Sequence, residues 1–229
     1  MGTGWFPMIW NPMSKANRRR IDCFHESGHA VMAWIEGVTI FEMRLVPDHE
    51  GGKHSATTSY DCPGAKPEEW TLNDIVAHMR ITMAGPVAEQ QGPAPVSAFE
   101  REFAKWEETQ HLMQAVQVIQ QFGANRINDD DIPILAESAR QDVIAVFRKT
   151  YVTQCLKTLA LQLLRCKSIS GPDAEALIAG RITDEQRNSL RLECCLSSAG
   201  QNQQERKALA GEPGAFKKPP ILTAGDTPD

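Results

Sequence analysis

The stretch CFHESGHAVMAWIEG, residues 23–37, decides the fold of this chain. Apolar residues recur at helical intervals from about residue 14, and Gly37 stands where such a helix would end. His25 and His29 are four positions apart, so their imidazoles lie on adjacent turns of one helix face. Glu26 lies between them. The pattern His-Glu-x-x-His on a helix is typical of zinc hydrolases, in which the histidines bind the ion and the glutamate is the general base.

The composition excludes several classes of partner. The 229 residues include 41% hydrophobic and 23% charged residues and carry a net charge of -5, so nothing attracts the chain to nucleic acid or to anionic lipid. No segment approaches the roughly 18 apolar residues that span a bilayer, and Pro7 and Pro12 interrupt the apolar run at the N-terminus. We therefore expect a cytoplasmic protein with no membrane or nucleic-acid partner. The six cysteines form no Cys-x-x-Cys pair, which predicts reduced and mostly buried thiols.

A small sheet is predicted directly after the first helix. Phe41, Met43 and Leu45 alternate with charged residues, which indicates a strand, and a second extended run covers residues 55–60. In a zinc peptidase, an edge strand beside the active-site helix binds the substrate by backbone pairing. Residues 41–46 and residues 55–60 are both candidates for that strand.

Further helices are predicted by apolar periodicity over residues 71–91 and 98–123, then in one long helix whose apolar positions run from 134 to 163. Thr71 or Asn73 is a candidate cap for the first of these, and Pro172 opens a short helix after a turn. The predicted fold class is therefore mainly α with a small β-sheet (α+β), in which a zincin-like active-site helix is followed by a helical bundle. We expect an extension over residues 1–19, one domain over residues 20–196, and a disordered tail over residues 197–229.

Four stretches in this order resemble the protease domain of FtsH, peptidase family M41. They are HESGHA, MAGPVAEQ, LMQAVQ and a late helix that leads into SISGPDAEALI, and they span about residues 20–178. The family's own versions of the first three read HEAGHA, Gly-Gly-x-Ala-Ala-Glu and Asp-Leu-x-x-Ala-Thr. The resemblance implies a zinc metalloendopeptidase in which His25 and His29 bind Zn²⁺ and Glu26 is catalytic. Members form rings of six, which suggests a homo-oligomer.

The resemblance also suggests a third zinc ligand. The family's acidic ligand lies four residues before an alanine that matches Ala115, and this chain has His111 at that place. A histidine can bind zinc in its stead. Glu108 and Glu107 are the alternatives if the helix register is shifted. Glu89 matches the glutamate of the second motif, and we expect it to orient a ligand imidazole, whereas His78 is interpreted as a structural residue.

The substrate class follows from what the chain lacks. FtsH proteins carry membrane helices and an AAA ATPase before the protease, and neither is present in this sequence. We therefore expect ATP-independent hydrolysis of unfolded or flexible polypeptides. The alternative function is a catalytically inactive binding or regulatory module of the same fold, and a third interpretation is a helical interaction protein with an accidental motif.

Overall fold

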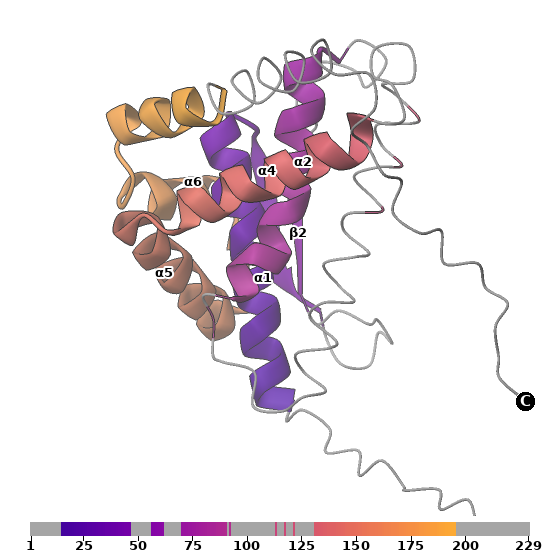
Figure 1. The fold of residues 1–229 in the computed structure, drawn as a ribbon. Coiled ribbons are helices and arrows are strands. Elements are labelled where there is room, and N and C mark those ends of the chain that lie inside the picture. The colour runs from indigo at the N-terminus through magenta and orange to yellow at the C-terminus, as the bar shows by residue number, and fades with distance from the viewer. Residues whose placement is uncertain are drawn as a thin grey trace, which may run out of the picture.

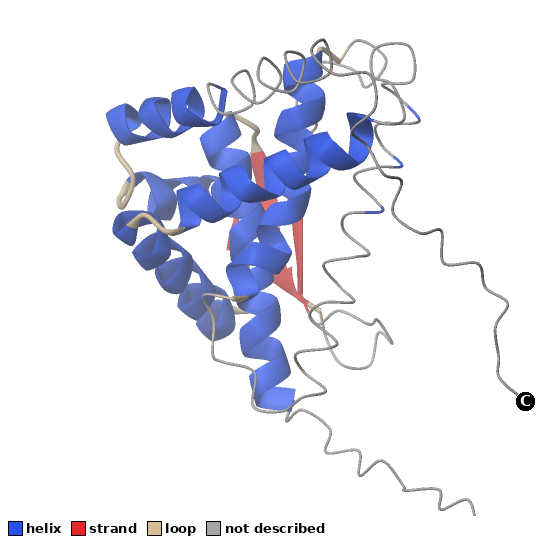
Figure 2. Cartoon of the chain, in the orientation of Figure 1, coloured by secondary structure: helices blue, strands red, loops and turns tan. Residues whose placement is uncertain are grey.

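The computed structural model describes residues 15–46, 56–61, 70–90, 92, 113, 117, 121 and 131–195. Within these ranges the chain is mainly helical, with one three-stranded antiparallel sheet beside the helices (Figure 2). The predicted α+β composition is confirmed. The predicted helix over residues 98–123 lies almost wholly outside the described residues, as do the N-terminal extension before residue 15 and the tail.

The first predicted helix is α1, Lys15–Glu36, and it forms the centre of the molecule (Figure 1). After the motif the helix is apolar and buried, and Ala30, Val31, Met32, Ala33 and Ile35 are all 0% exposed. Gly37 ends the helix with a φ of 83°, a conformation that favours glycine. The backbone N–H of Val38 then donates to the Ala33 carbonyl at 2.9 Å, which turns the chain into the sheet.

The sheet consists of β1 Ile40–Leu45, β2 Ala56–Tyr60 and β3 Ser168–Ser170, in the spatial order β2-β1-β3. β1 pairs antiparallel with both neighbours, so both of its edges are occupied. β2 therefore has the free edge on its side of the sheet as the structure describes it. The sequence analysis predicted a turn in place of β3, because three residues are too few to show an alternating pattern.

The helix after the sheet is α2, Leu72–Glu89, which lies against α1 on one side and against α4 on the other (Figure 1). Thr71 is its N-cap, because its hydroxyl accepts from the Asp74 backbone N–H while the Asp74 carboxylate accepts from the Thr71 backbone N–H. This capping box decides between the two candidate caps in favour of Thr71. Thirteen consecutive or near-consecutive residues of α2 are buried, so this helix is enclosed on most sides.

The single long helix predicted for residues 134–163 is wrong. Two helices occupy this stretch, α4 Ile132–Phe147 and α5 Thr150–Cys166, and Lys149 between them is extended, with a ψ of 127°. The stretch contains no Gly or Pro that would reveal the break. The Thr153 hydroxyl donates to the Phe147 carbonyl at 2.7 Å and so satisfies part of the interrupted helix end. The bend lets α4 pack on α2 while α5 packs on α1.

The chain closes with α6, Gly171–Ala179, and a helical segment over residues 184–195. Pro172 lies in the first turn of α6 as predicted, and the Ser170 hydroxyl caps it. The cysteines within the described ranges are all free. Cys23, Cys155 and Cys194 are buried, and Cys166 and Cys195 are exposed. No helix in the described part of the chain is long and apolar enough to cross a membrane.

Candidate metal centre

The His-Glu-x-x-His residues lie in the middle of α1, where α2 crosses it at close range. A Cβ added to Gly28 would lie only 2.3 Å from the Ala84 carbonyl oxygen of α2, so the crossing depends on glycine. His25, Glu26 and His29 are 6%, 7% and 9% exposed. Three ionisable side chains are therefore held in an interior that tolerates them only with partners.

Each histidine ring is oriented by a partner at its Nδ1 atom. His29 Nδ1 lies 2.7 Å from the Ile81 carbonyl oxygen, and His25 Nδ1 lies 2.6 Å from Glu89 Oε1. A carbonyl or carboxylate oxygen can only accept, so each Nδ1 carries the proton. A neutral imidazole in this tautomer has its lone pair on Nε2. Glu89 was predicted to orient a ligand imidazole, and its contact with His25 agrees with that hypothesis.

The two Nε2 atoms face each other at 3.0 Å. The rings are nearly perpendicular, with centroids 4.7 Å apart and planes at 73°. Space next to these atoms comes from Gly85 of α2, because a Cβ there would lie 2.5 Å from both Nε2 atoms. Two nitrogen lone pairs therefore converge on a point that only a glycine leaves open.

This donor set fits Zn²⁺. Two nitrogen ligands of a tetrahedral zinc, each at about 2.0–2.1 Å, are roughly 3.3 Å apart, close to the observed separation. Partners at Nδ1 that fix the tautomer are the usual support for ligand histidines. Within the described residues, no group of three or more His, Cys, Asp or Glu is placed to hold a metal ion. His111, Glu108 and Glu107, the residues predicted to complete the site, all lie outside those residues.

Glu26 is held against β2. The Thr58 hydroxyl donates to the Glu26 carbonyl oxygen at 3.1 Å. Burial raises the pKa of the Glu26 carboxyl to about 7; hydrogen bonds from Thr58 lower it, and the charge of Asp22 raises it further. A carboxyl with this pKa can both take and return a proton near neutral pH. A bound cation nearby would shift the pKa downward.

β2 lies along the side of α1 that carries the motif. Thr58 contacts Glu26, and two residues later the Tyr60 ring lies 6.4 Å from the His29 ring, centroid to centroid. Side chains two apart in a strand point to the same face, so one face of β2 borders the motif. Of the two candidate edge strands, β1 lies inside the sheet, and β2 has an edge that no other described strand pairs with.

Three residues that contact or make room for the motif side chains were not predicted from the sequence. The Ile81 carbonyl and Thr58 carry no sequence signal, and Gly85 gave a signal only as the glycine of MAGPVAEQ. His78 is half-buried, and its ring centroid lies 5.2 Å from that of Trp70; burial lowers its pKa. His49 and His54 lie outside the described residues.

No model of a known protein family matches this chain, and no curated protein matches it either. The geometry of its own residues is therefore what indicates its function. The convergence of His25 and His29 beside Gly85 is the most specific feature among them.

Proposed function

We propose that this chain is a zinc metallopeptidase that hydrolyses peptide bonds in unfolded or flexible polypeptides without ATP. His25, His29 and His111 hold the ion, and Glu26 is the general base. One observation carries the proposal: the Nε2 atoms of the two motif histidines converge at 3.0 Å, while both Nδ1 atoms are engaged by acceptors. The resemblance to FtsH proteases supports the same function, and it suggests a homo-oligomer.

The chemistry of Glu26 follows from its place. A Zn²⁺ ion held by the motif histidines would supply a polarising charge for the scissile carbonyl and would lower the pKa of a water toward 7. Glu26, next in sequence to His25 and 7% exposed, takes the proton from that water and returns it to the departing amine. Burial keeps the carboxyl basic enough for the first step, and the contact of Thr58 with the Glu26 carbonyl fixes this part of the helix against β2.

The unpaired edge of β2 is the proposed substrate-binding strand. An extended peptide can add to a strand edge through backbone hydrogen bonds, which recognise the main chain and not the sequence. Since Thr58 and Tyr60 of this strand contact Glu26 and approach His29, a peptide on this edge would pass close to the base and the metal ligands. Most backbone groups of a folded protein are already paired, so unfolded or flexible chains are the proposed substrates.

His111 is proposed as the third ligand by resemblance, with Glu108 and Glu107 as alternatives. His111 and the two glutamates lie outside the described residues, so the binding test below decides among them.

Metal analysis and a cleavage assay test the proposal together. We expect about one zinc per purified chain, lost in His25→Ala, and cleavage of casein that Glu26→Gln abolishes while zinc is retained. Zinc that is retained without cleavage of any unfolded substrate would favour the inactive binding module. A wild-type chain that binds no zinc contradicts the proposed metal site.

The third ligand is tested by comparing zinc affinity in His111→Ala and Glu108→Ala. We expect a large loss in the first and little change in the second. The opposite result would transfer the role to Glu108. Negligible losses in both variants would remove this helix from the site.

A further inference from the structure

Tyr60 is the last residue of β2, and its ring borders the motif histidines. The ring lies 6.4 Å from the His29 ring, centroid to centroid, with the two planes at 34°. Two positions earlier, the Thr58 hydroxyl donates to the Glu26 carbonyl oxygen at 3.1 Å. Side chains two apart in a strand share a face, so Thr58 and Tyr60 both point toward α1. A half-buried phenol therefore lies beside the proposed metal centre.

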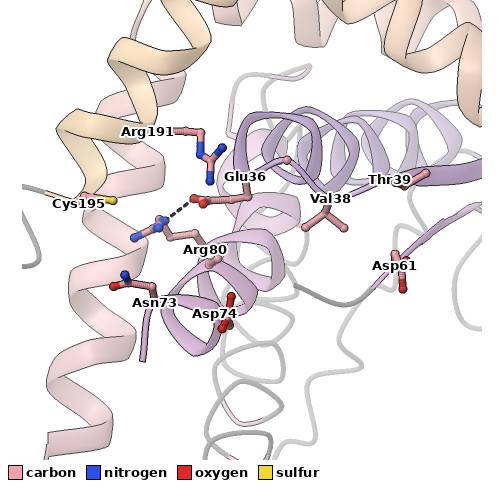
Figure 3. A pocket seen from close by; sticks show the side chains of 11 residues that line it. Glu36, Val38, Thr39, Asp61, Asn73, Asp74, Arg80, Arg191 and Cys195 are labelled. Atoms are coloured by element: carbon pink, nitrogen blue, oxygen red, sulfur yellow. Dashed lines mark hydrogen bonds and ion pairs between the residues drawn. The ribbon is translucent and has the colours of Figure 1, made fainter. Parts of the chain in front are cut away.

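The backbone on both sides holds Tyr60 in this place. Tyr60 pairs with Ile40 in the register of β1 and β2, and the next residue, Asp61, donates its backbone N–H to the Thr39 carbonyl at 2.9 Å. The Asp61 side chain lines a separate cavity at the C-terminal end of α1 (Figure 3). The two neighbouring side chains thus face different parts of the molecule. A group on a paired strand keeps its position more precisely than a group on a loop.

Other hydroxyl groups close to the motif are used inside the protein. The hydroxyls of Ser27 and Thr82 each donate to the helix carbonyl four residues earlier, at 2.7 and 2.9 Å. The Thr58 hydroxyl donates to Glu26. A hydroxyl has one proton to donate, so these three fix backbone and do not serve a substrate. The hydroxyl of Tyr60 differ from them in kind, because the ring carries it too far from its own backbone for such a local bond.

Hydrolysis of a peptide bond needs a donor where negative charge develops. As the water oxygen bonds to the carbonyl carbon, a water proton goes to Glu26 and the C=O electron pair moves onto the carbonyl oxygen. That electron pair then returns, the C–N bond breaks, and the leaving nitrogen takes the proton from Glu26. A fixed hydrogen-bond donor at the oxyanion is worth roughly 10²- to 10³-fold in rate. A peptide on the edge of β2 passes Thr58 and Tyr60, so its carbonyl comes close to the phenol.

We propose that Tyr60 is a catalytic residue of this peptidase, and that its phenol donates a hydrogen bond to the oxyanion of the tetrahedral intermediate. The inference rests on the proposed function and adds a residue to it. The proton stays on the phenol throughout, so no further group is needed to restore it. Because the oxyanion exists only in and near the transition state, the contribution of Tyr60 falls on kcat and not on KM.

The first test removes the hydroxyl and keeps the ring, as Tyr60→Phe does. Tyr151→Phe in α5 is the matched control, because the chain contains two tyrosines and both are half-buried. With casein as substrate, we expect kcat of Tyr60→Phe to fall about 100-fold, with KM changed by no more than about twofold. Zinc bound per chain should equal that of the wild type in both variants. A tyrosine that only packs against its neighbours would leave kcat unchanged.

Inhibitor binding gives a second readout that needs no turnover. Calorimetry compares a phosphinic analogue of an alanine hexapeptide, whose tetrahedral P–O⁻ stands for the oxyanion, with the reduced-amide analogue, which has no oxygen there. We expect Tyr60→Phe to bind the phosphinic peptide at least tenfold more weakly than the wild type does. The reduced-amide peptide should bind equally to both, because it offers the phenol nothing to donate to.

The outcomes separate this inference from the proposed function. If the wild type binds no zinc or cleaves no unfolded chain, the proposed function fails and the role of Tyr60 fails with it. If the wild type cleaves, but Tyr60→Phe matches its kcat or its affinity for the phosphinic peptide, only this inference is overturned. Loss of zinc from Tyr60→Phe also overturns it, since the hydroxyl would then support the metal centre and not the oxyanion.

Discussion

Two polar clusters interrupt the apolar contact between α1 and α2, and they differ in what balances them. At one, the Arg80 guanidinium lies between the carboxylates of Glu36 and Asp142, so opposite charges meet directly. At the other, Glu89 and the Ile81 carbonyl orient two imidazoles whose Nε2 lone pairs face each other. The first cluster already contains its own cation. The second is complementary to a cation, as the proposed metal site requires.

Arg80→Met removes the cation that Glu36 and Asp142 share, and we expect the largest effect from it. Glu36 and Asp142 would be left buried without the guanidinium, which costs about 3–5 kcal/mol of unfolding free energy. Urea denaturation of the variant and of Arg165→Met, an exposed control, measures the loss. Zinc bound per folded chain should not change. If the unfolding free energy hardly changes, these charges do not stabilise the fold. The Arg80 cluster would then not be a structural ion pair, and its contrast with the motif histidines would fail.

Gly85→Ala acts on the proposed metal centre instead. The added Cβ would lie 2.5 Å from both Nε2 atoms, so the imidazoles must move apart or turn away. We expect zinc affinity to fall at least a hundredfold, about 2.7 kcal/mol. Gly180→Ala is the control, because the nearest atom to its Cβ is 3.3 Å away and its φ is -68°. Equal zinc affinity in Gly85→Ala and wild type would show that the ion is not held at this point.

The same contrast explains which features the sequence could predict. Both imidazoles come from one helix, so their spacing of four residues was enough to place them together. The end of α1 at Gly37 and the cap at Thr71 also depend on neighbouring residues alone. These predictions were confirmed because every contact behind them is local in the chain.

The missed features depend on contacts between distant residues. Glu36 and Arg80 are 44 positions apart, and Arg80 and Asp142 are 62 apart, so no short pattern contains either pair. The break at Lys149 has no Gly or Pro, and it follows from α4 and α5 packing on different helices. Tertiary packing decided these features, and the periodicity of apolar residues does not record it.

Glu89→Gln tests whether the partner of His25 tunes the site. Glutamine keeps an oxygen that can accept from His25 Nδ1, but the charge that makes the imidazole a better ligand is lost. We expect zinc affinity to fall about 10- to 100-fold, while the unfolding free energy of the metal-free chain changes by about 1 kcal/mol or less. Competition with a coloured chelator measures the affinity. An unchanged affinity would reduce Glu89 to a packing partner.

The smallest effect concerns Cys194, which is 2% exposed and lies close enough to the Arg80 cluster to feel its charges. Burial raises the pKa of this thiol to about 12; Arg80 lowers it, and Asp142 and Glu36 raise it. Between about pH 9 and pH 12 the unfolded chain has lost a proton that the folded chain keeps, so stability falls as the pH rises. This thiol contributes up to about 1.4 kcal/mol per pH unit to that slope.

Cys194→Ala removes this contribution, whereas the cavity it creates costs the same at every pH. The unfolding free energies of wild type and variant should therefore differ by a constant below pH 9 and converge above it. Cys195→Ala, an exposed neighbour, is the control, and its curve should run parallel to the wild type. Parallel curves for Cys194→Ala as well would mean that water reaches the thiol in the folded chain. The Arg80 cluster would then be open to solvent. Only the result for Arg80→Met would still distinguish this cluster from the proposed metal centre.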